Sequence, residues 1–213
     1  MLYLAYQTHA DIMVPVRTLA QAGLTALGPW AASDDLKALR NLTAAYELIS
    51  RAGLRHERPA YGIETVRVGN RDVGVHEDGL AATPFGTLLH FRKDVRIAQP
   101  RVLVVAPLSG HFATLLRSLV RTLLPEHDVC ITDWHNARDA STTDGRFGFD
   151  DYIDHLIQWL EKMGPGTHIV AVCQPCVQVL AAAAVMAQSG SAAQPRSMTL
   201  MAARSTRASI PPR

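Results

Sequence analysis

Two cysteines lie three residues apart, where an apolar, strand-like run changes into a helix-forming run. The sequence there reads Ile-Val-Ala-Val-Cys173-Gln-Pro-Cys176-Val177, and an alanine-rich segment follows. A cysteine on a turn from a strand to a helix stands above the carboxyl end of a sheet, beside the first backbone N–H groups of the helix. This is the position of a nucleophile, and the pattern predicts that role for Cys176.

The same residues allow three interpretations. As C-x-x-C with Pro175 inside, they resemble the redox motif of thioredoxin-like oxidoreductases, although such a module carries its motif after its first strands and Cys173 comes late in this chain. As a nucleophile elbow, residues 174–178 take the place of G-x-S-x-G, with both glycines replaced and cysteine in the serine position. As small buried hydrophobic residues, the two cysteines would have no chemical role.

Composition narrows the class of protein. The chain has 213 residues, of which 48% are hydrophobic and 19% charged, so it is able to form one globular domain with an N-terminal appendage. A formal net charge of +2 with scattered basic residues argues against a nucleic-acid partner. No apolar run approaches the ~20 residues of a membrane span, and the first residues do not form a signal peptide. Three cysteines, including Cys130, form no disulfide framework, and we expect a cytoplasmic protein.

The first part of the chain has the spacing of helices. Apolar residues at helical intervals predict a helix over 2–27 that is interrupted at Pro15, and Ser33-Asp34-Asp35 then caps a second helix that runs to about Ala52. The polar residues 55–60 look like a linker. We therefore predict an N-terminal helical segment over 1–58.

Beyond this segment the sequence predicts an α/β fold over 59–201. Residues 65–68 and 72–77 alternate around Gly69-Asn70, which is a hairpin signal, and 86–92 is another strand candidate. Strands and helices then alternate, which predicts a mostly parallel sheet with helices on both faces: strands at 102–106, 129–132, 168–172 and 198–201, and helices at 112–124, 149–163 and 177–188. Antiparallel leading strands followed by such units are the layout of an α/β-hydrolase, in this case an incomplete one, and that fold carries its nucleophile where Cys176 lies.

Four blocks of sequence, taken in order, resemble the intracellular polyhydroxyalkanoate (poly-3-hydroxybutyrate) depolymerases. The resemblance runs from the N-terminus to about Met201. It rests on Pro107-Leu-Ser109-Gly110-His111-Phe-Ala-Thr-Leu-Leu-Arg117, on Ile131-Thr-Asp133-Trp134-His135-Asn136-Ala137-Arg138-Asp139, on Gly145-Arg-Phe-Gly-Phe-Asp150-Asp-Tyr-Ile, and on Val172-Cys-Gln-Pro-Cys176-Val.

The resemblance implies an activity and a partner. In that family the cysteine of Gln-Pro-Cys-Val attacks the polyester, which gives Cys176 the role of nucleophile. The thiolate forms an acyl-enzyme and water then releases the acid, without a cofactor. The expected partner is the polyhydroxyalkanoate granule, and the expected location is the granule surface in the cytoplasm.

The oxyanion of this reaction needs N–H donors. In an α/β-hydrolase they come from the residue after the nucleophile, here Val177, and from the loop after the first parallel strand, here Ser109, Gly110 and His111. The same loop also fits an ordinary N-cap and turn that open the next helix, and one loop is able to do both.

Asp133 and Trp134 follow a predicted strand at the carboxyl edge of the sheet, where open α/β sheets bind ligands, and we predict that they shape the pocket wall. The alternative is a salt-bridged loop with a half-buried tryptophan. His135 and His155 receive no catalytic role, because a lone histidine usually lies on the surface or is satisfied in the core. No histidine cluster with ligand spacing and no glycine-rich phosphate loop is present, so we expect no metal and no nucleotide.

The chain departs from the hydrolase pattern after Cys176, since no histidine, aspartate or glutamate follows it. A cysteine nucleophile needs a base and an acid that orients the base. The family would continue Gly-Gly-Pro-Ile-Asp-Thr-Arg after Met201, whereas residues 202–213 read like a shifted frame. We therefore expect an aberrant tail over 202–213, a truncated or frameshifted product, and little ester turnover.

Three other functions remain open at this point. The first is a non-catalytic remnant that binds granules without cleaving the polymer. The second is an acyltransferase similar to the polyhydroxyalkanoate synthases, whose elbow keeps glycines around the cysteine. The third is a C-x-x-C redox protein, which requires an exposed attacking thiol at Cys173, whereas the strand pattern predicts that Cys173 is buried in the strand.

Overall fold

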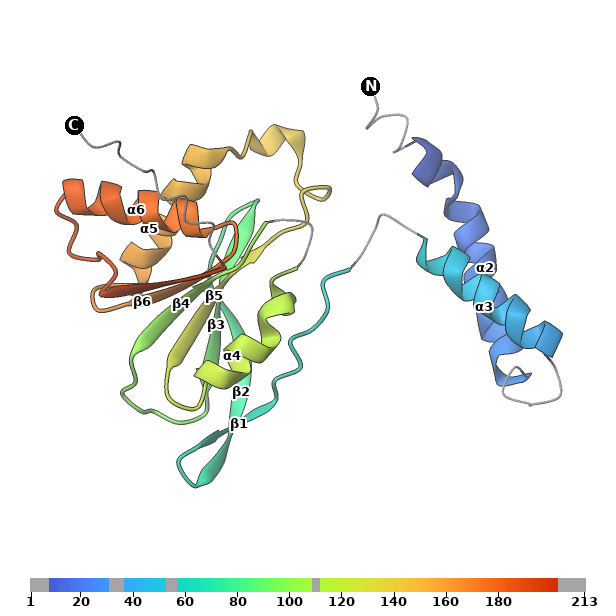
Figure 1. Cartoon of the computed structure of the whole chain (residues 1–213), viewed down its shortest axis with the longest axis horizontal. Coiled ribbons are helices and arrows are strands. Elements are labelled where there is room, and N and C mark those ends of the chain that lie inside the picture. The colour runs from blue at the N-terminus through green and yellow to red at the C-terminus, as the bar shows by residue number, and fades with distance from the viewer. Residues whose placement is uncertain (1–7, 31–36, 53–56, 109–111, 203–213) are drawn as a thin grey trace, which may run out of the picture. The chain divides into compact units, whose positions relative to one another are not determined.

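The computed structural model describes residues 8–30, 37–52, 57–108 and 112–202. The chain divides into two compact units, Met1–Glu57 and Arg58–Arg213. Figure 1 shows the first unit as helices and the second as a sheet with helices.

The N-terminal unit contains α2 (Val14–Leu27), the short helix η1 (Gly28–Trp30) and α3 (Lys37–Arg51). The first helix is interrupted as predicted, but at Met13 rather than at Pro15: Pro15 occupies the first turn of α2, where its missing N–H leaves no bond unmade. A Cβ atom on Gly23 would lie 2.6 Å from the Tyr46 ring, so the two helices pack closely there. The predicted cap at residues 33–35 lies outside the described residues.

The second unit is built on a seven-stranded sheet in the order β1-β2-β3-β5-β4-β6-β7. The first three strands are antiparallel to their neighbours, and β4, β5, β6 and β7 are parallel to one another. The bounds are β1 Thr65–Val68, β2 Arg71–Ala82, β3 Gly86–Lys93, β4 Arg101–Val105, β5 Asp128–Trp134, β6 His168–Val172 and β7 Ser197–Met201. The predicted α/β class, with antiparallel leading strands before a parallel series, is confirmed.

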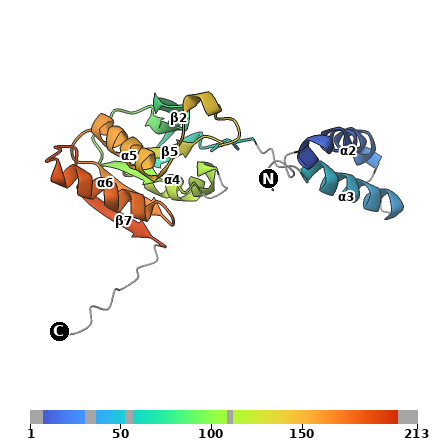
Figure 2. The same cartoon turned by 90° about the horizontal axis from the view of Figure 1, so that it is seen from above.

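The helices of this unit follow from the strand order. They are α4 (Arg117–Leu123), which is preceded by η2 (Ala113–Leu116), then α5 (Phe149–Met163), which is preceded by η3 (Thr142–Asp144), and α6 (Cys176–Gln188). The step from β4 to β5 runs one way across the sheet, and the steps to β6 and β7 run the other way. Because such crossovers are right-handed, α4 covers one face, and α5 and α6 cover the other. Figures 1 and 2 show α5 and α6 side by side, away from α4.

The core lies around the two central strands. All of the side chains from Val102 to Val105 in β4 and from Val129 to Trp134 in β5 are buried, as expected for parallel strands covered on both faces. Three predicted elements differ in extent: the helix over 112–124 is divided into η2 and the shorter α4, and the strands predicted at 72–77 and 129–132 are the longer β2 and β5.

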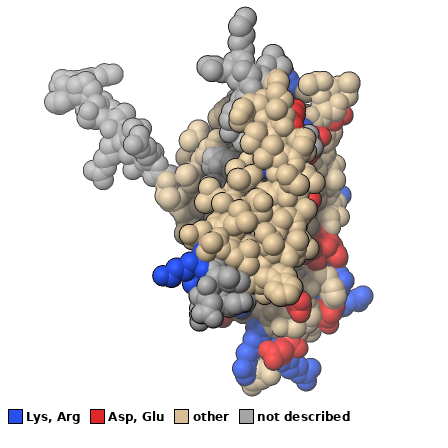
Figure 3. All heavy atoms as spheres, turned by 90° about the vertical axis from the view of Figure 1, so that its right-hand side faces the viewer, with Lys and Arg blue, Asp and Glu red and all other residues tan. Residues whose placement is uncertain are grey.

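Within the described residues, no helix is both long and apolar enough to span a bilayer. Most of the face drawn in Figure 3 is tan, and the described Lys, Arg, Asp and Glu side chains lie mainly towards its lower end, with both signs of charge side by side.

Candidate active site at the carboxyl ends of the parallel strands

The strand order identifies one position in the sheet where a ligand is expected. The chain leaves β4 towards β5 and leaves β6 towards β7, so these two neighbouring strands are followed by connections on opposite faces. In open α/β sheets the crevice beyond the carboxyl ends of two such strands is the usual binding site. Cys173 directly follows β6 at this point. Residues Ser109, Gly110 and His111, the predicted oxyanion loop, follow β4 but lie outside the described residues.

The turn from β6 to α6 is sharp and strained at one residue. Cys173 has a φ of 69°, a left-handed conformation that is uncommon for any residue other than glycine. Gln174 and Pro175 complete the turn, and α6 begins at Cys176. Strained backbone of this kind clusters at functional sites, and a sharp strand-to-helix turn is the geometry of a nucleophile elbow.

The two thiols of this turn differ in access. Cys173 is exposed, so the prediction that it lies buried in the strand is wrong. The reason is that β6 ends at Val172 and the positive φ of Cys173 turns the chain away from the sheet, while the Cys173 N–H donates to Met201 O at 2.8 Å.

Cys176, by contrast, is only 2% exposed. Its Sγ atom lies 3.5 Å from Ala171 O and 3.7 Å from Met201 O. Burial raises the pKa of the Cys176 thiol. The next residue, Val177, is 61% exposed, and its N–H points at Gln174 O over 3.5 Å. The geometry therefore gives the exposed sulfur to Cys173 and the buried one to Cys176.

Asp133 and Trp134 are the last two residues of β5 rather than part of a loop, and they point to opposite faces of the sheet. Trp134 is 5% exposed, so it is buried rather than half-buried. Its ring lies against Tyr152 and Trp159 of α5, at centroid distances of 4.5 and 5.1 Å, and its Nε1–H donates to Ala106 O at 3.0 Å. This contact fixes Ala106, the residue that directly follows β4.

The buried carboxylate of Asp133 forms an ion pair with the more exposed Arg58, whose Nε lies 2.5 Å from Oδ2. The other oxygen, Oδ1, is buried and has no hydrogen-bond partner within the described part of the chain, and the same holds for the hydroxyl of Tyr61. Burial raises the pKa of the Asp133 carboxyl despite the nearby guanidinium, which also lies over the Tyr61 ring at 5.1 Å from its centroid. The ion pair ties the segment before β1 to the end of β5.

Arg58 and Tyr61 were not among the predicted site residues, because residues 55–60 look like a polar linker. A linker does not need a buried aromatic ring, and Tyr61, 0% exposed, directly follows it. Within the linker, Arg58 also reaches Glu77 of β2 at 3.3 Å.

Neither described histidine near the carboxyl end of β5 contacts a thiol. The ring of His135 lies 2.9 Å from Thr87 Oγ1 and 3.1 Å from Pro84 O. The ring of His155 lies 2.7 Å from Asp151 O and 3.1 Å from Thr83 Oγ1, among aromatic side chains. Both rings are thus engaged in structural contacts.

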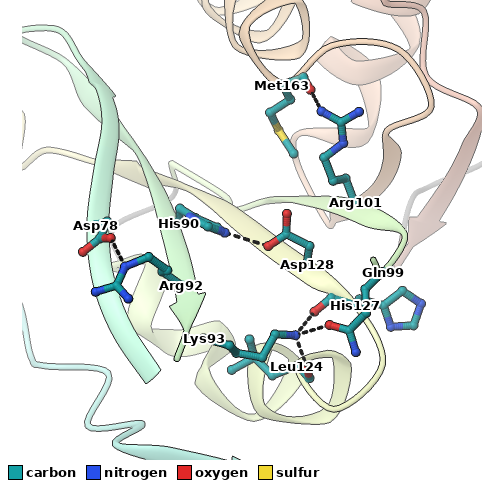
Figure 4. Close-up of polar contacts among 10 residues, drawn as sticks. All are labelled: Asp78, His90, Arg92, Lys93, Gln99, Arg101, Leu124, His127, Asp128 and Met163. Carbon is teal, nitrogen blue, oxygen red and sulfur yellow. Dashed lines mark hydrogen bonds and ion pairs between the residues drawn. The ribbon is translucent and has the colours of Figure 1, made fainter. Parts of the chain in front are cut away.

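The opposite end of the sheet has a hollow of about 730 Å³, lined by the end of β3, residues 94–99 and Asp128. Its polar groups bind one another: His90 Nε2 lies 2.6 Å from Asp128 Oδ1, and Lys93 donates to Gln99 and to the carbonyls of Leu124 and His127 (Figure 4). These contacts tie the end of β3 and the β3–β4 connection to the segment before β5.

Within the described residues, no group of three or more His, Cys, Asp or Glu side chains is arranged to hold a metal ion. In comparisons with known proteins, neither a family model nor a curated protein matches this chain.

Proposed function

We propose that this chain carries the nucleophile of an α/β-hydrolase active site that cleaves ester bonds of intracellular polyhydroxyalkanoate. The observation that carries the proposal is the exposed thiol of Cys173, which follows β6 directly, in a strained conformation, beside the switch point of the sheet. An exposed thiol at the N-terminal side of a helix is the position of a reactive cysteine.

The four sequence blocks that resemble the depolymerases support the proposed reaction, although the resemblance itself assigns the nucleophile to Cys176. Residues 107–117 follow β4, residues 131–139 begin in β5 and continue past its end, and residues 172–177 form the turn after β6. Three blocks from distant parts of the sequence therefore meet along one edge of the sheet, because the carboxyl ends of parallel strands lie together. Residues 145–153 open α5, which packs on Trp134 of the second block. On this basis we also propose the granule surface in the cytoplasm as the place of action.

The access of the two thiols favours Cys173 over Cys176 as the attacking atom. In the proposed reaction the Cys173 sulfur loses its proton and forms a bond to the ester carbonyl carbon. The carbon–oxygen bond of the ester breaks, and the hydroxyacyl alcohol leaves with a proton. The N–H of Gln174, the residue after Cys173, is then a candidate oxyanion donor, as Val177 is in the Cys176 alternative.

Hydrolysis of the thioester needs a base for the attacking water. The described histidines closest to the carboxyl end of β5, His135 and His155, are bonded to other groups and contact neither thiol of the turn. We therefore expect the first step to outrun the second, so that the acyl-enzyme accumulates.

The test is acylation by the p-nitrophenyl ester of a 3-hydroxybutyrate oligomer, followed by intact-mass measurement. We expect a burst of about one nitrophenol per chain, a mass increase of one acyl group, and slow turnover afterwards. Cys173→Ala abolishes the burst, whereas Cys176→Ala and the buried control Cys130→Ala keep it. Release of 3-hydroxybutyrate from amorphous granules is measured in parallel.

A burst lost in Cys176→Ala and kept in Cys173→Ala would return the nucleophile to Cys176. The esterase proposal would be overturned if no cysteine carried an acyl group in a chain that circular dichroism shows to be folded. Granule co-sedimentation without acylation would then indicate the non-catalytic remnant.

A further inference from the structure

The turn between β6 and α6 carries a second sulfur that ester chemistry does not use. Cys173 is exposed and Cys176 is buried. The Cys176 N–H donates to Cys173 O at 3.3 Å, which closes the turn across Gln174 and Pro175. The two cysteines are therefore the first and last residues of one hydrogen-bonded turn.

This turn brings the two residues within disulfide range. A β-turn keeps its first and fourth Cα atoms less than about 7 Å apart, and disulfides join residues whose Cα atoms are about 4.4–6.8 Å apart. Both ends of the turn are already fixed, since Cys173 N–H donates to Met201 O at 2.8 Å and Val179 N–H donates to Pro175 O at 2.9 Å. A cross-link then requires rotation of the two side chains and little movement of the backbone.

The present contacts of Cys176 do not oppose that rotation strongly. Its Sγ lies at 3.5 Å from Ala171 O and 3.7 Å from Met201 O, and a thiol is a weak donor. Only Cys173 has to be reached from solvent, because Cys176 would react from inside the turn.

We propose that Cys173 and Cys176 form a redox switch: a hydroperoxide oxidises the exposed thiol, and the buried thiol closes an intra-turn disulfide. The Cys173 thiolate attacks the peroxide, the O–O bond breaks, and a sulfenic acid forms with release of one water or alcohol. The Cys176 sulfur then attacks the Cys173 sulfur and displaces a second water. In total, two thiols lose two hydrogens, and one hydroperoxide is reduced.

The disulfide occupies the sulfur that the proposed ester cleavage needs, so oxidation switches off acylation and a dithiol reductant restores it. This consequence rests on the proposed function, whereas the cross-link itself does not. The disulfide also protects Cys173 from irreversible oxidation to the sulfinic acid, because the Cys176 thiol that reacts with the sulfenic acid lies in the same turn.

Cys130 serves as an internal control. It is 3% exposed in β5, and burial raises its pKa to about 12. A buried thiol with so little thiolate reacts slowly with peroxide.

The experiment uses the full chain, treated with hydrogen peroxide in the folded state, then unfolded in urea, blocked with N-ethylmaleimide and cleaved with trypsin. Residues 163–196 form one peptide with both cysteines of the turn, and residues 122–138 form another with Cys130. After peroxide we expect the first peptide to carry no maleimide group and to weigh two hydrogens less than its reduced, unalkylated form. The second peptide should carry a maleimide group on Cys130 in full. In Cys176→Ala, dimedone should label Cys173 as a sulfenic acid, and in Cys173→Ala peroxide should leave Cys176 alkylatable.

Two outcomes overturn the switch: alkylation of both turn cysteines after peroxide, or a stable dimedone adduct on Cys173 while Cys176 remains present. Acylation by the oligomer ester, measured before oxidation, after oxidation and after dithiothreitol, tests the second consequence separately. A disulfide that forms in a chain without any acylation refutes the esterase and leaves the switch standing. A disulfide that leaves acylation unchanged refutes the inhibitory role.

Discussion

The two ends of β5 place an aspartate in opposite situations. Asp128, at the amino end, accepts a hydrogen bond from His90, which lowers the pKa of its carboxyl. Asp133, near the carboxyl end, is buried with one oxygen that has no partner in the described part of the chain, and burial raises its pKa. The same strand thus carries a hydrogen-bonded carboxylate with a lowered pKa at one end, and a buried carboxylate with a raised pKa at the other.

The contrast extends to the whole sheet. At the amino end, Lys93 donates to two carbonyls and a side-chain amide, and Arg101 donates to Met163 O (Figure 4). Arg101 also donates to Pro165 O. At the carboxyl end, Cys173 has a positive φ and Gln178 has a buried oxygen without a partner in the described residues. Local rules are usually broken where a protein binds or reacts. The described polar groups at the amino end are thus held by hydrogen bonds, whereas the carboxyl end keeps a strained residue and an unpartnered buried oxygen.

The largest effect is expected from Trp134→Ala. Its ring fills the space between β5 and α5, and its N–H holds Ala106 O at 3.0 Å. Removing such a buried aromatic side chain costs about 3–5 kcal/mol, measured as the free energy of unfolding in urea. Trp134→Phe keeps most of the ring and loses the N–H, so it should cost much less. Equal losses for the two variants would mean that the hydrogen bond to Ala106, rather than packing, fixes the carboxyl end.

A smaller loss is expected from Lys93→Met at the amino end. The ammonium bonds Leu124 O at 2.8 Å and His127 O at 2.7 Å, and these carbonyls would lose their charged donor. We expect about 2 kcal/mol less stability, with an unchanged rate of alkylation at Cys173. Arg96→Met, on the same connection and exposed, is the matched control and should cost little. A slower reaction at Cys173 in Lys93→Met would contradict the contrast between the two ends.

Thr132→Val tests the carboxyl end on a finer scale. The Thr132 hydroxyl is buried and accepts a hydrogen bond from the Ala106 N–H at 2.9 Å. Valine has nearly the same shape and leaves that N–H without its partner, so we expect a loss of about 1–2 kcal/mol. The control is Thr122→Val. The Thr122 hydroxyl is exposed and bonds within its own helix, so its removal should change stability much less. A neutral Thr132→Val would show that the end of β4 does not depend on this bond.

Much of this architecture is predictable from periodicity. The patterns predict β1, β6 and α5 with the bounds that the structure has, because each is an uninterrupted alternation or helical repeat between turn residues. The extension of β2 to Ala82 was not predicted. Its Asp-Gly-Leu-Ala-Ala end favours turns, and only pairing with β3, with a register shift at Gly79, makes it a strand.

The site was predictable only in part. The turn after the strand 168–172 was visible as Gln-Pro, but the sequence does not reveal a positive φ at Cys173, since few residues other than glycine adopt it. The exposure of the two thiols was therefore assigned in the wrong order. The pair Arg58–Asp133 joins residues far apart in sequence, and no local pattern records such a contact.

The smallest predicted effect compares the two aspartates directly, through Asp128→Asn and Asp133→Asn. Asp128 has a lowered pKa, so its contribution to stability is present above the ordinary carboxyl pKa of about 3.9 and is lost as the pH falls below it. Asp133 has a raised pKa, so its contribution is present below about pH 3.9 and is lost as the pH rises through the folded-state value. Asp128→Asn should therefore be less stable than the parent chain near neutral pH, and this difference should vanish in acid. Asp133→Asn should gain stability relative to the parent chain as the pH rises towards neutral.

Urea unfolding at a series of pH values between about 3 and 7 measures both differences. We expect changes below about 1 kcal/mol for the half-exposed Asp128, because solvent screens its pair with His90. The signs matter more than the sizes. If both variants changed stability with pH in the same direction, the two ends of β5 would be electrostatically alike. The buried, unpartnered oxygen of Asp133 would then not be evidence that ionised Asp133 lowers the free energy of unfolding at the carboxyl end.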